Sequence, residues 1–189
     1  MTAGGTRLTV LGGAGQPDTA PAFLRIAIVG LGAVGASLAL ALRRAWPGAL
    51  VIGVDGHDVI ETAMRMHAVD VASDDLMIAG DADLVVLAGA PEANARALGH
   101  LAEAIPGEAV VLALGEAAAA AELAPLLPGR LALVAGLPVV ELRGRGIHAS
   151  SADLFAGRRW PVMPLTARAG DVDRIHDLVR AVGADPAAV

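Results

Sequence analysis

The sequence contains no cysteine, which excludes disulfide bonds, thiol catalysis and cysteine-ligated zinc together. It also lacks tyrosine, and aromatic residues make up only 2% of the chain, so the core has to be built from Ala, Val, Leu and Ile. Such a core suits buried parallel strands that are covered by alanine-rich helices. The lack of cysteine is compatible with a reducing cytoplasm, where we expect the protein.

Positive charge is scarce, because the formal net charge is −6 and the pI is about 5.2. A nucleic-acid surface needs clustered Lys and Arg, so we expect no nucleic-acid partner. Long apolar runs are absent as well. The longest uncharged run, residues 26–42, is interrupted by glycines and is shorter than the roughly 20 residues that span a bilayer. We therefore expect no membrane segment, and residues 1–24 lack the pattern of a secretory signal.

A length of 189 residues suits one domain with a full core. We expect an N-terminal arm over residues 1–24 and a single dinucleotide-binding domain over residues 25–189. The arm contains a strand-like run at residues 8–11 that glycines follow, but Gln16 and Pro17 stop a helix from starting there. We expect no phosphate-binding role for the arm.

The stretch from Arg25 to Asp58 organises the chain, because it reads as a βαβ unit. It predicts a strand over residues 26–29, a helix over residues 36–45 and a second strand over residues 50–54. The alternative is an apolar hairpin that happens to be rich in glycine. Strand, glycine turn, helix, second strand and terminal acid coincide here, and together they favour a dinucleotide site.

Three glycines, Gly30, Gly32 and Gly35, form the pattern G-x-G-x-x-G between the first strand and the helix. The first allows a tight turn, the second lets the backbone approach a pyrophosphate, and the third lets helix and strand pack closely. The helix N-terminus then offers unpaired N–H groups to the phosphates. Asp55 ends the second strand, where its carboxylate can accept hydrogen bonds from a ribose.

The acid at position 55 also indicates the type of cofactor. A carboxylate suits a free 2′-hydroxyl and repels a 2′-phosphate, and the next residues, Gly56 and His57, supply no arginine to hold that phosphate. We therefore predict NAD rather than NADP. The loop after the next long strand should lie at the same edge of the sheet. The residues expected to contact NAD are Gly30, Leu31, Gly32, Ala33, Val34, Gly35, Asp55, Gly89 and Ala90.

Strand and helix patterns alternate along the rest of the chain, which predicts an α/β fold with a doubly wound, mostly parallel, Rossmann-like sheet. The further expected strands cover residues 69–71, 82–88, 108–114, 131–135 and 159–165. The further expected helices cover residues 57–67, 92–104, 116–127 and 171–182, with a helical turn near 76–78. A long polar connection, residues 136–151, separates the last two strands.

Few side chains outside the glycine motif suggest chemistry. His148 in the long connection could act as a base, although a solvated loop residue is the simpler interpretation, and His57 could touch the adenosine. Arg143 and Arg145 could bind a carboxylate, although a solvated loop is the simpler interpretation, and Glu141 or Glu116 could take a proton. No two histidines show metal-ligand spacing supported by a carboxylate, so we predict no metal.

Several segments together resemble the N-terminal domain of prephenate dehydrogenases. They are IAIVGLGAVGASLALALRR, VIGVD, AVDVASDDL, DADLVVLA and ADLFAGRRWPVMP, of which ADLFAGRRW is the most specific. The resemblance covers residues 25 to about 182. It implies a transfer of hydride from the hydroxyl-bearing ring carbon of prephenate to NAD, with loss of carbon dioxide to give 4-hydroxyphenylpyruvate in tyrosine biosynthesis.

The chain departs from that family at its catalytic positions. The family histidine stands in a G-H-P-M-A-G-S-E segment, which is GLPVVELR here, so its position is Leu137. Leucine can neither accept nor release a proton. The family pattern D-x-G-S-x-K after the strand at 108–114 places Glu116 at the serine and Ala118 at the lysine. These exchanges change the local charge by two units, in the wrong direction for a dianionic substrate.

The resemblance also implies an all-helical C-terminal domain that forms the dimer and completes the substrate pocket, and this sequence stops where that domain would begin. A homodimer, or a helical domain supplied elsewhere, is therefore an open expectation. Two functions compete: an NAD-dependent dehydrogenase of the prephenate type, with an altered substrate as one variant, and an NAD-binding module that has lost catalysis. A dehydrogenase of another kind would need a lysine or histidine base, and none is obvious.

Overall fold

The computed structural model describes residues 20–186, so the expected strand at residues 8–11 lies outside the described residues. Strands and helices alternate, as the sequence predicts. In chain order the elements are β1 (Arg25–Val29), α1 (Ala33–Ala45), β2 (Leu50–Val54), α2 (His57–Arg65), β3 (Val71–Ser73), η1 (Leu76–Ala79), β4 (Leu84–Leu87), α3 (Pro91–Ala104), β5 (Ala109–Leu114), α4 (Ala117–Leu123), η2 (Ala124–Leu126), β6 (Leu131–Gly136), η3 (Ile147–Ala149), β7 (Val162–Pro164) and α5 (Ala169–Ala181).

The seven strands form one sheet in the order β3-β2-β1-β4-β5-β6-β7. The first six run parallel, which confirms the doubly wound, mostly parallel fold. The chain crosses from β3 to β4, on the other side of β1, so the strand order reverses between β1 and β4. Ligands of open α/β sheets bind at the carboxyl ends of the strands at such a switch point.

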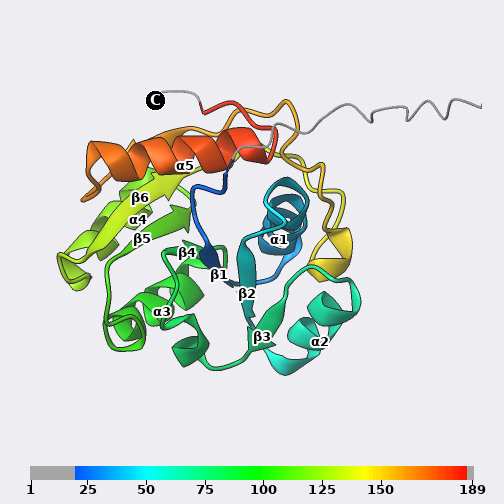
Figure 1. The fold of residues 1–189 in the computed structure, drawn as a ribbon, viewed down its shortest axis with the longest axis horizontal. Helices are drawn as coiled ribbons and strands as arrows, with labels where there is room; N and C mark the ends of the chain where they lie inside the picture. Colours follow the sequence, from blue (N-terminus) through cyan, green and yellow to red (C-terminus); the bar gives the residue numbers. More distant parts are fainter. Residues whose placement is uncertain (1–19, 187–189) are drawn as a thin grey trace, which may run out of the picture.

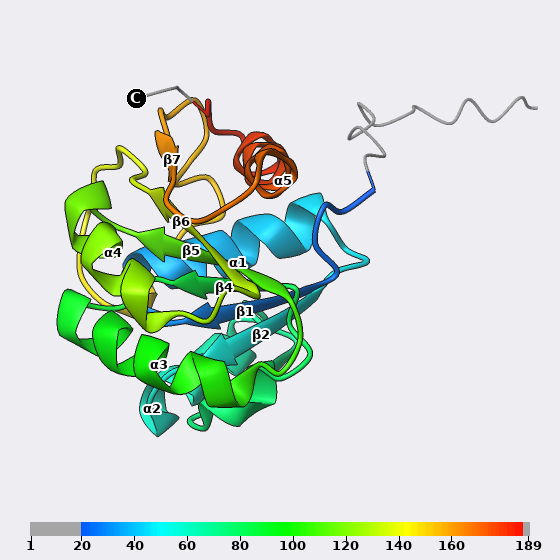
Figure 2. The ribbon, with the colours of Figure 1, turned by 90° about the vertical axis from the view of Figure 1, so that its left-hand side faces the viewer.

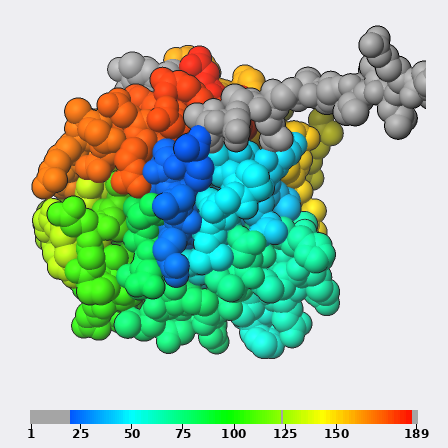
Figure 3. Space-filling model, viewed as in Figure 1, coloured from blue at the N-terminus to red at the C-terminus, as the bar shows by residue number. Residues whose placement is uncertain are grey.

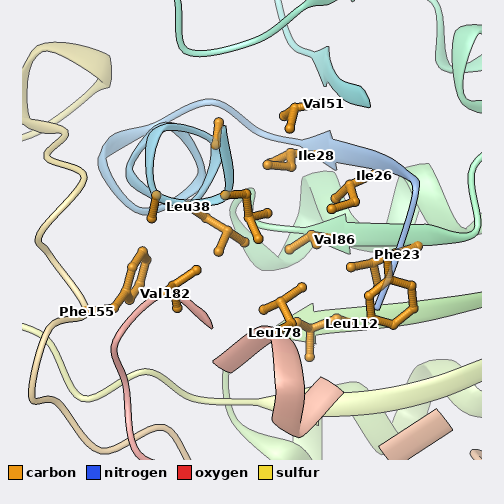
Figure 4. Close-up of a cluster of buried hydrophobic side chains, with 14 of the residues drawn as sticks. Phe23, Ile26, Ile28, Leu38, Val51, Val86, Leu112, Phe155, Leu178 and Val182 are labelled. Atoms are coloured by element: carbon orange, nitrogen blue, oxygen red, sulfur yellow. The ribbon is translucent and has the colours of Figure 1, made fainter. Parts of the chain in front are cut away.

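Helices cover both faces of the sheet, with α1 and α5 on one face and α3 and α4 on the other (Figures 1 and 2). Side chains along β1 alternate between the two layers. Ile26 and Ile28 join the core under α1 and α5, whereas Ala27 joins the core under α3. Leu38 from α1 and Leu178 from α5 both belong to the first of these cores (Figure 4).

The last strand differs from the prediction. The pattern at 159–165 gives only the three-residue β7, which runs antiparallel to β6. No α-helix lies between β6 and β7, so the connection is not the helical crossover that parallel pairing requires. Prolines at 161 and 164 also remove backbone donors from this segment, which shortens the ladder.

Several helix boundaries differ from the prediction, and two of the differences have a local reason. Helix α1 begins at Ala33 rather than at residue 36, because Gly32 already adopts the extended conformation of an N-cap. The helix predicted over 116–127 ends as an α-helix at Leu123 and continues as the 3-10 turn η2. Pro125 explains this change, because proline has no N–H to donate within a helix and clashes with the preceding turn.

The segment before β1 contacts the helix α5 (Figure 3). The Asp83 carboxylate, just before β4, accepts hydrogen bonds from the backbone N–H groups of Leu24 (3.0 Å) and Arg25 (2.9 Å). The same carboxylate lies 3.3 Å from the guanidinium of Arg174 on α5. That guanidinium also lies 4.0 Å from the centre of the buried Phe23 ring. These contacts attach β1 to α5 at the amino-terminal ends of the strands.

Candidate functional site

The glycine turn between β1 and α1 is tightly packed against the end of β4. Gly30 has a φ of +94°, and a Cβ atom there would lie 2.6 Å from the backbone nitrogen of Gly89. A Cβ atom on Gly35 would lie 1.9 Å from the carbonyl oxygen of Gly30. Both positions therefore require glycine. A Cβ atom on Gly32 would meet nothing within 4 Å, so the turn is open to a ligand at its middle glycine.

The amino end of α1 points out of this turn. No side chain caps it within the described part of the chain, and its first turn contains no acidic residue. Its backbone N–H groups and the positive end of the helix dipole are thus available to an anion. Arg43 and Arg44 in the last turn complement the opposite end of the dipole.

Asp55 is held directly beside the turn. Its Oδ2 atom accepts a hydrogen bond of 2.6 Å from the N–H of Leu31, and its Oδ1 atom accepts one of 2.7 Å from the N–H of Gly56. The carboxylate is thereby oriented by two backbone donors from two loops. Each carboxylate oxygen has a further lone pair, so the group can also accept hydrogen bonds from the hydroxyls of a sugar.

The loop after β4 closes the other side of the turn, and Asn94 of α3 holds it in place. The Oδ1 atom of this buried side chain accepts a 3.0 Å hydrogen bond from the N–H of Gly89, and its Nδ2 atom lies 3.4 Å from the carbonyl of Leu87. The sequence predicts roles for Gly89 and Ala90 but not for Asn94. A buried amide one turn into a helix that follows a glycine loop is the signal that could have identified it.

The residues at the catalytic positions of the resemblance offer no proton-transfer group of the expected type. Leu137 follows β6 with 45% of its surface exposed, and its N–H donates to the carbonyl of Pro161. Glu116 precedes α4 and is exposed. Gly115, between β5 and α4, donates a 3.0 Å hydrogen bond to the carbonyl of Gly136, so the ends of β5 and β6 lie together.

Within residues 20–186, no side-chain hydrogen bond or ion pair joins the other candidate residues to Leu137 or Glu116. His148 lies exposed in η3, which packs against α1 and α2, the opposite face of the sheet from α4. Arg143, Arg145 and Glu141 are exposed in the connection between β6 and η3. His57 opens α2 directly after the Asp55 loop and lies 3.3 Å from Glu61.

Over residues 20–186, no group of three or more His, Asp or Glu side chains could hold a metal ion. None of the helices in that part of the chain is long and apolar enough to cross a membrane.

Comparison with known proteins identifies the family of most of the chain. Residues 38–187 match the family model described as prephenate dehydrogenase, nucleotide-binding domain, a match that begins just after the glycine turn. A search of the curated proteins found no match.

Three solved structures illustrate the similarity. Synechocystis arogenate dehydrogenase is 25% identical, with a TM-score of 0.80 over 88% of this chain and 59% of that one. Prephenate dehydrogenase from Aquifex aeolicus, in complex with hydroxyphenyl propionate and NAD+, is 21% identical, with the same TM-score and coverage. The (S)-3-hydroxybutyryl-CoA dehydrogenase PaaH1 from Ralstonia eutropha is 14% identical, with a TM-score of 0.64 over 88% and 63% of the two chains. The chain thus spans about three fifths of the length of these structures.

Proposed function

Because this chain belongs to the family of prephenate dehydrogenase nucleotide-binding domains, we propose that it binds NAD and serves the hydride transfer of an NAD-dependent oxidoreductase. The observation that carries this proposal is the Asp55 carboxylate, which is fixed beside the open glycine turn by the N–H of Leu31. The NAD+ bound in the similar Aquifex aeolicus structure supports the choice of nucleotide.

The residues of the turn have the chemistry that a dinucleotide requires. The amides at the start of α1 would bind the pyrophosphate, which passes over Gly32, where no atom lies within 4 Å of a Cβ position. Asp55 would accept hydrogen bonds from the adenosine ribose, and Gly89 and Ala90 would let the nicotinamide half pass close to the end of β4. NAD itself supplies the acceptor for a hydride from the substrate.

Titration with NADH tests the cofactor assignment. We expect NADH to bind more tightly than NADPH, because the Asp55 carboxylate repels a 2′-phosphate. Asp55→Ala should weaken NADH binding about tenfold or more, since hydrogen bonds to a charged group contribute roughly 1.5–3 kcal/mol. Asp173→Ala, which removes an exposed carboxylate from α5, is the matched control and should leave NADH affinity unchanged. Equal affinities for NADH and NADPH would contradict the assignment.

We further propose that the reaction is of the prephenate dehydrogenase type with an altered substrate. Family membership supports oxidation at a carbon that bears a hydroxyl or a related group, and Leu137 and Glu116 are the reasons for expecting a different substrate. Leu137 cannot take the proton that a histidine would accept there. The assay is the appearance of NADH absorbance when prephenate and NAD are mixed with the protein, and we expect it to be weak.

A second candidate is an NAD-binding module without catalysis, with a regulatory or structural role. The exposed Leu137 side chain at the end of β6 favours it, because that position supplies neither an acid nor a base. Sustained turnover of prephenate by this chain would contradict this candidate. Leu137→His provides the complementary test: a gain of turnover would identify the missing histidine as the main defect.

A further inference from the structure

A cavity lies beside the proposed nucleotide site, between the amino-terminal parts of α3 and α4. It has a volume of about 420 Å³ and opens at the carboxyl ends of β4 and β5. Small-molecule sites are commonly mostly apolar cavities of roughly 300–1,000 Å³ at this edge of an α/β sheet. We propose that this cavity binds a small organic cation, an amine carried on a compact aliphatic body.

The cavity is separated from the glycine turn by one backbone segment. Gly89 lines the cavity, and its nitrogen lies 2.6 Å from where a Cβ atom of Gly30 would be. Asn94, which also lines the cavity, holds this Gly89 peptide through its buried Oδ1 atom. A ligand in the cavity would therefore lie next to a dinucleotide on the turn, so the inference rests on the proposed function and names the class of its substrate.

The apolar part of the cavity is aliphatic and built from small side chains. Pro91, Ala95, Leu114 and Ala119 are among the lining residues, and no aromatic side chain is. Alanine methyl groups leave room where larger side chains would fill the space between the two helices. The hydrophobic body of a ligand can thus be buried without moving the helices, because the space already exists.

The charged lining residues carry a single sign. Glu92, Glu116 and Glu122 line the cavity, and none of them forms an ion pair with another described residue. No arginine lines it, and the sequence contains no lysine. A carboxylate or phosphate ligand would meet like charge here, whereas an ammonium group would be attracted. Glu116 is the residue that replaces the serine of the family pattern, so the selection is a property of this chain.

Three probes of one shape test the proposal: cyclohexylamine, cyclohexanol and cyclohexanecarboxylate. Each is titrated into the full chain with NADH present, while the backbone amide resonances of Gly89 and Gly115 are followed by NMR. We expect cyclohexylamine to shift both resonances and to bind about tenfold more tightly than the carboxylate, with the alcohol between them. Added salt should weaken amine binding, because the carboxylates are exposed. Equal affinities for the three probes would overturn the proposal.

Variants locate the charge that selects the ligand. Glu116→Gln and Glu122→Gln should each weaken amine binding about two- to fivefold, as expected for partly solvated ion pairs. Glu103→Gln, an exposed change on α3 outside the cavity, is the matched control and should have no effect. Circular dichroism of each variant checks the fold. No effect of either cavity variant in folded protein would overturn the inference.

Nucleotide binding provides an independent readout. If NADH binds and the amine does not, the cavity inference fails while the NAD-binding proposal stands. If the amine binds and NADH does not, the NAD-binding proposal fails instead. Omitting the nucleotide adds a final arm: amine binding that is present without NADH and lost when NADH is added would mean that the cavity holds the nicotinamide ring, and this would refute the separate site for an amine.

Discussion

Substitution of Gly35 separates the packing role of the glycine turn from its binding role. A Cβ atom at position 35 would lie 1.9 Å from the carbonyl oxygen of Gly30, and ordinary contact begins at 3.4 Å. The oxygen would have to retreat by the difference, about 1.5 Å, while the Ala88 methyl group, at 3.1 Å from the same point, limits movement on another side. In Gly35→Ala, helix α1 must therefore shift relative to β1.

The size of the effect follows from this overlap. Overpacking typically costs about 1–3 kcal/mol, and a clash with a backbone oxygen belongs at the upper end of this range. Alanine recovers up to about 1 kcal/mol over glycine in a helix, so we expect a net loss of about 2 kcal/mol in the free energy of unfolding. With a urea m-value of about 2 kcal/mol/M, the midpoint falls by about 1 M. Trp46 and Trp160 are both buried, so their fluorescence reports the transition. NADH affinity should fall with stability, because the turn is displaced.

Gly32→Ala is the matched control for this experiment. Gly32 has a φ of −67°, which any residue can adopt, and a Cβ atom there meets nothing within 4 Å. We expect the urea midpoint to stay unchanged while NADH affinity falls about tenfold, since the methyl group occupies the approach to the pyrophosphate. If Gly35→Ala unfolded at the wild-type urea concentration, the reasoning about helix and strand contact would be refuted. Wild-type NADH affinity in Gly32→Ala would refute the placement of the pyrophosphate.

Asp83→Asn should lower the free energy of unfolding by about 2 kcal/mol, because an amide group cannot accept from two backbone N–H groups and the guanidinium together, and urea unfolding measures this loss. Asp81→Asn, at a side chain that is 82% exposed, should change it by less than about 0.5 kcal/mol, and equal losses at 81 and 83 would contradict this account. Gly136→Ala should lower the free energy of unfolding by about 1–3 kcal/mol, since its Cβ atom would lie 2.7 Å from Nε1 of the buried Trp160. A wild-type Tm for Gly136→Ala would show that the indole moves aside at little cost.

The βαβ unit could be predicted from the sequence because its signals are local. The apolar run of β1, the spaced glycines and the apolar run of β2 each determine their own conformation, and β2 spans residues 50–54 as predicted. The same pattern predicts that the acid Asp55 lies beside the glycine turn. The hydrogen bond from the N–H of Leu31 to Asp55 agrees with this prediction. The contacts of all nine expected cofactor residues with NAD remain predictions.

The parts that depend on distant partners could not be predicted in the same way. The antiparallel direction of β7 follows from a connection without a helical crossover, and nothing in the local sequence of the strand indicates this. Asn94 accepts a hydrogen bond from the N–H of Gly89, five residues earlier in the chain. A single polar residue in a helix does not by itself predict such a contact. The cavity between α3 and α4 arises from the spacing of two helices that are separate in the sequence. Its three glutamates are therefore brought to one cavity only by the fold.

The attachment of α5 to the start of the sheet has a consequence for the order of folding. The guanidinium of Arg174 donates to the carbonyl of Ala22, across a sequence separation of 152 residues, and β1 lies in the interior of the sheet between β2 and β4. Strand β1 thus depends on contacts with α5, which lies far away in the sequence. Contacts between such distant segments raise the contact order and slow folding. During synthesis, the segment before β1 would gain these contacts only after α5 has emerged from the ribosome.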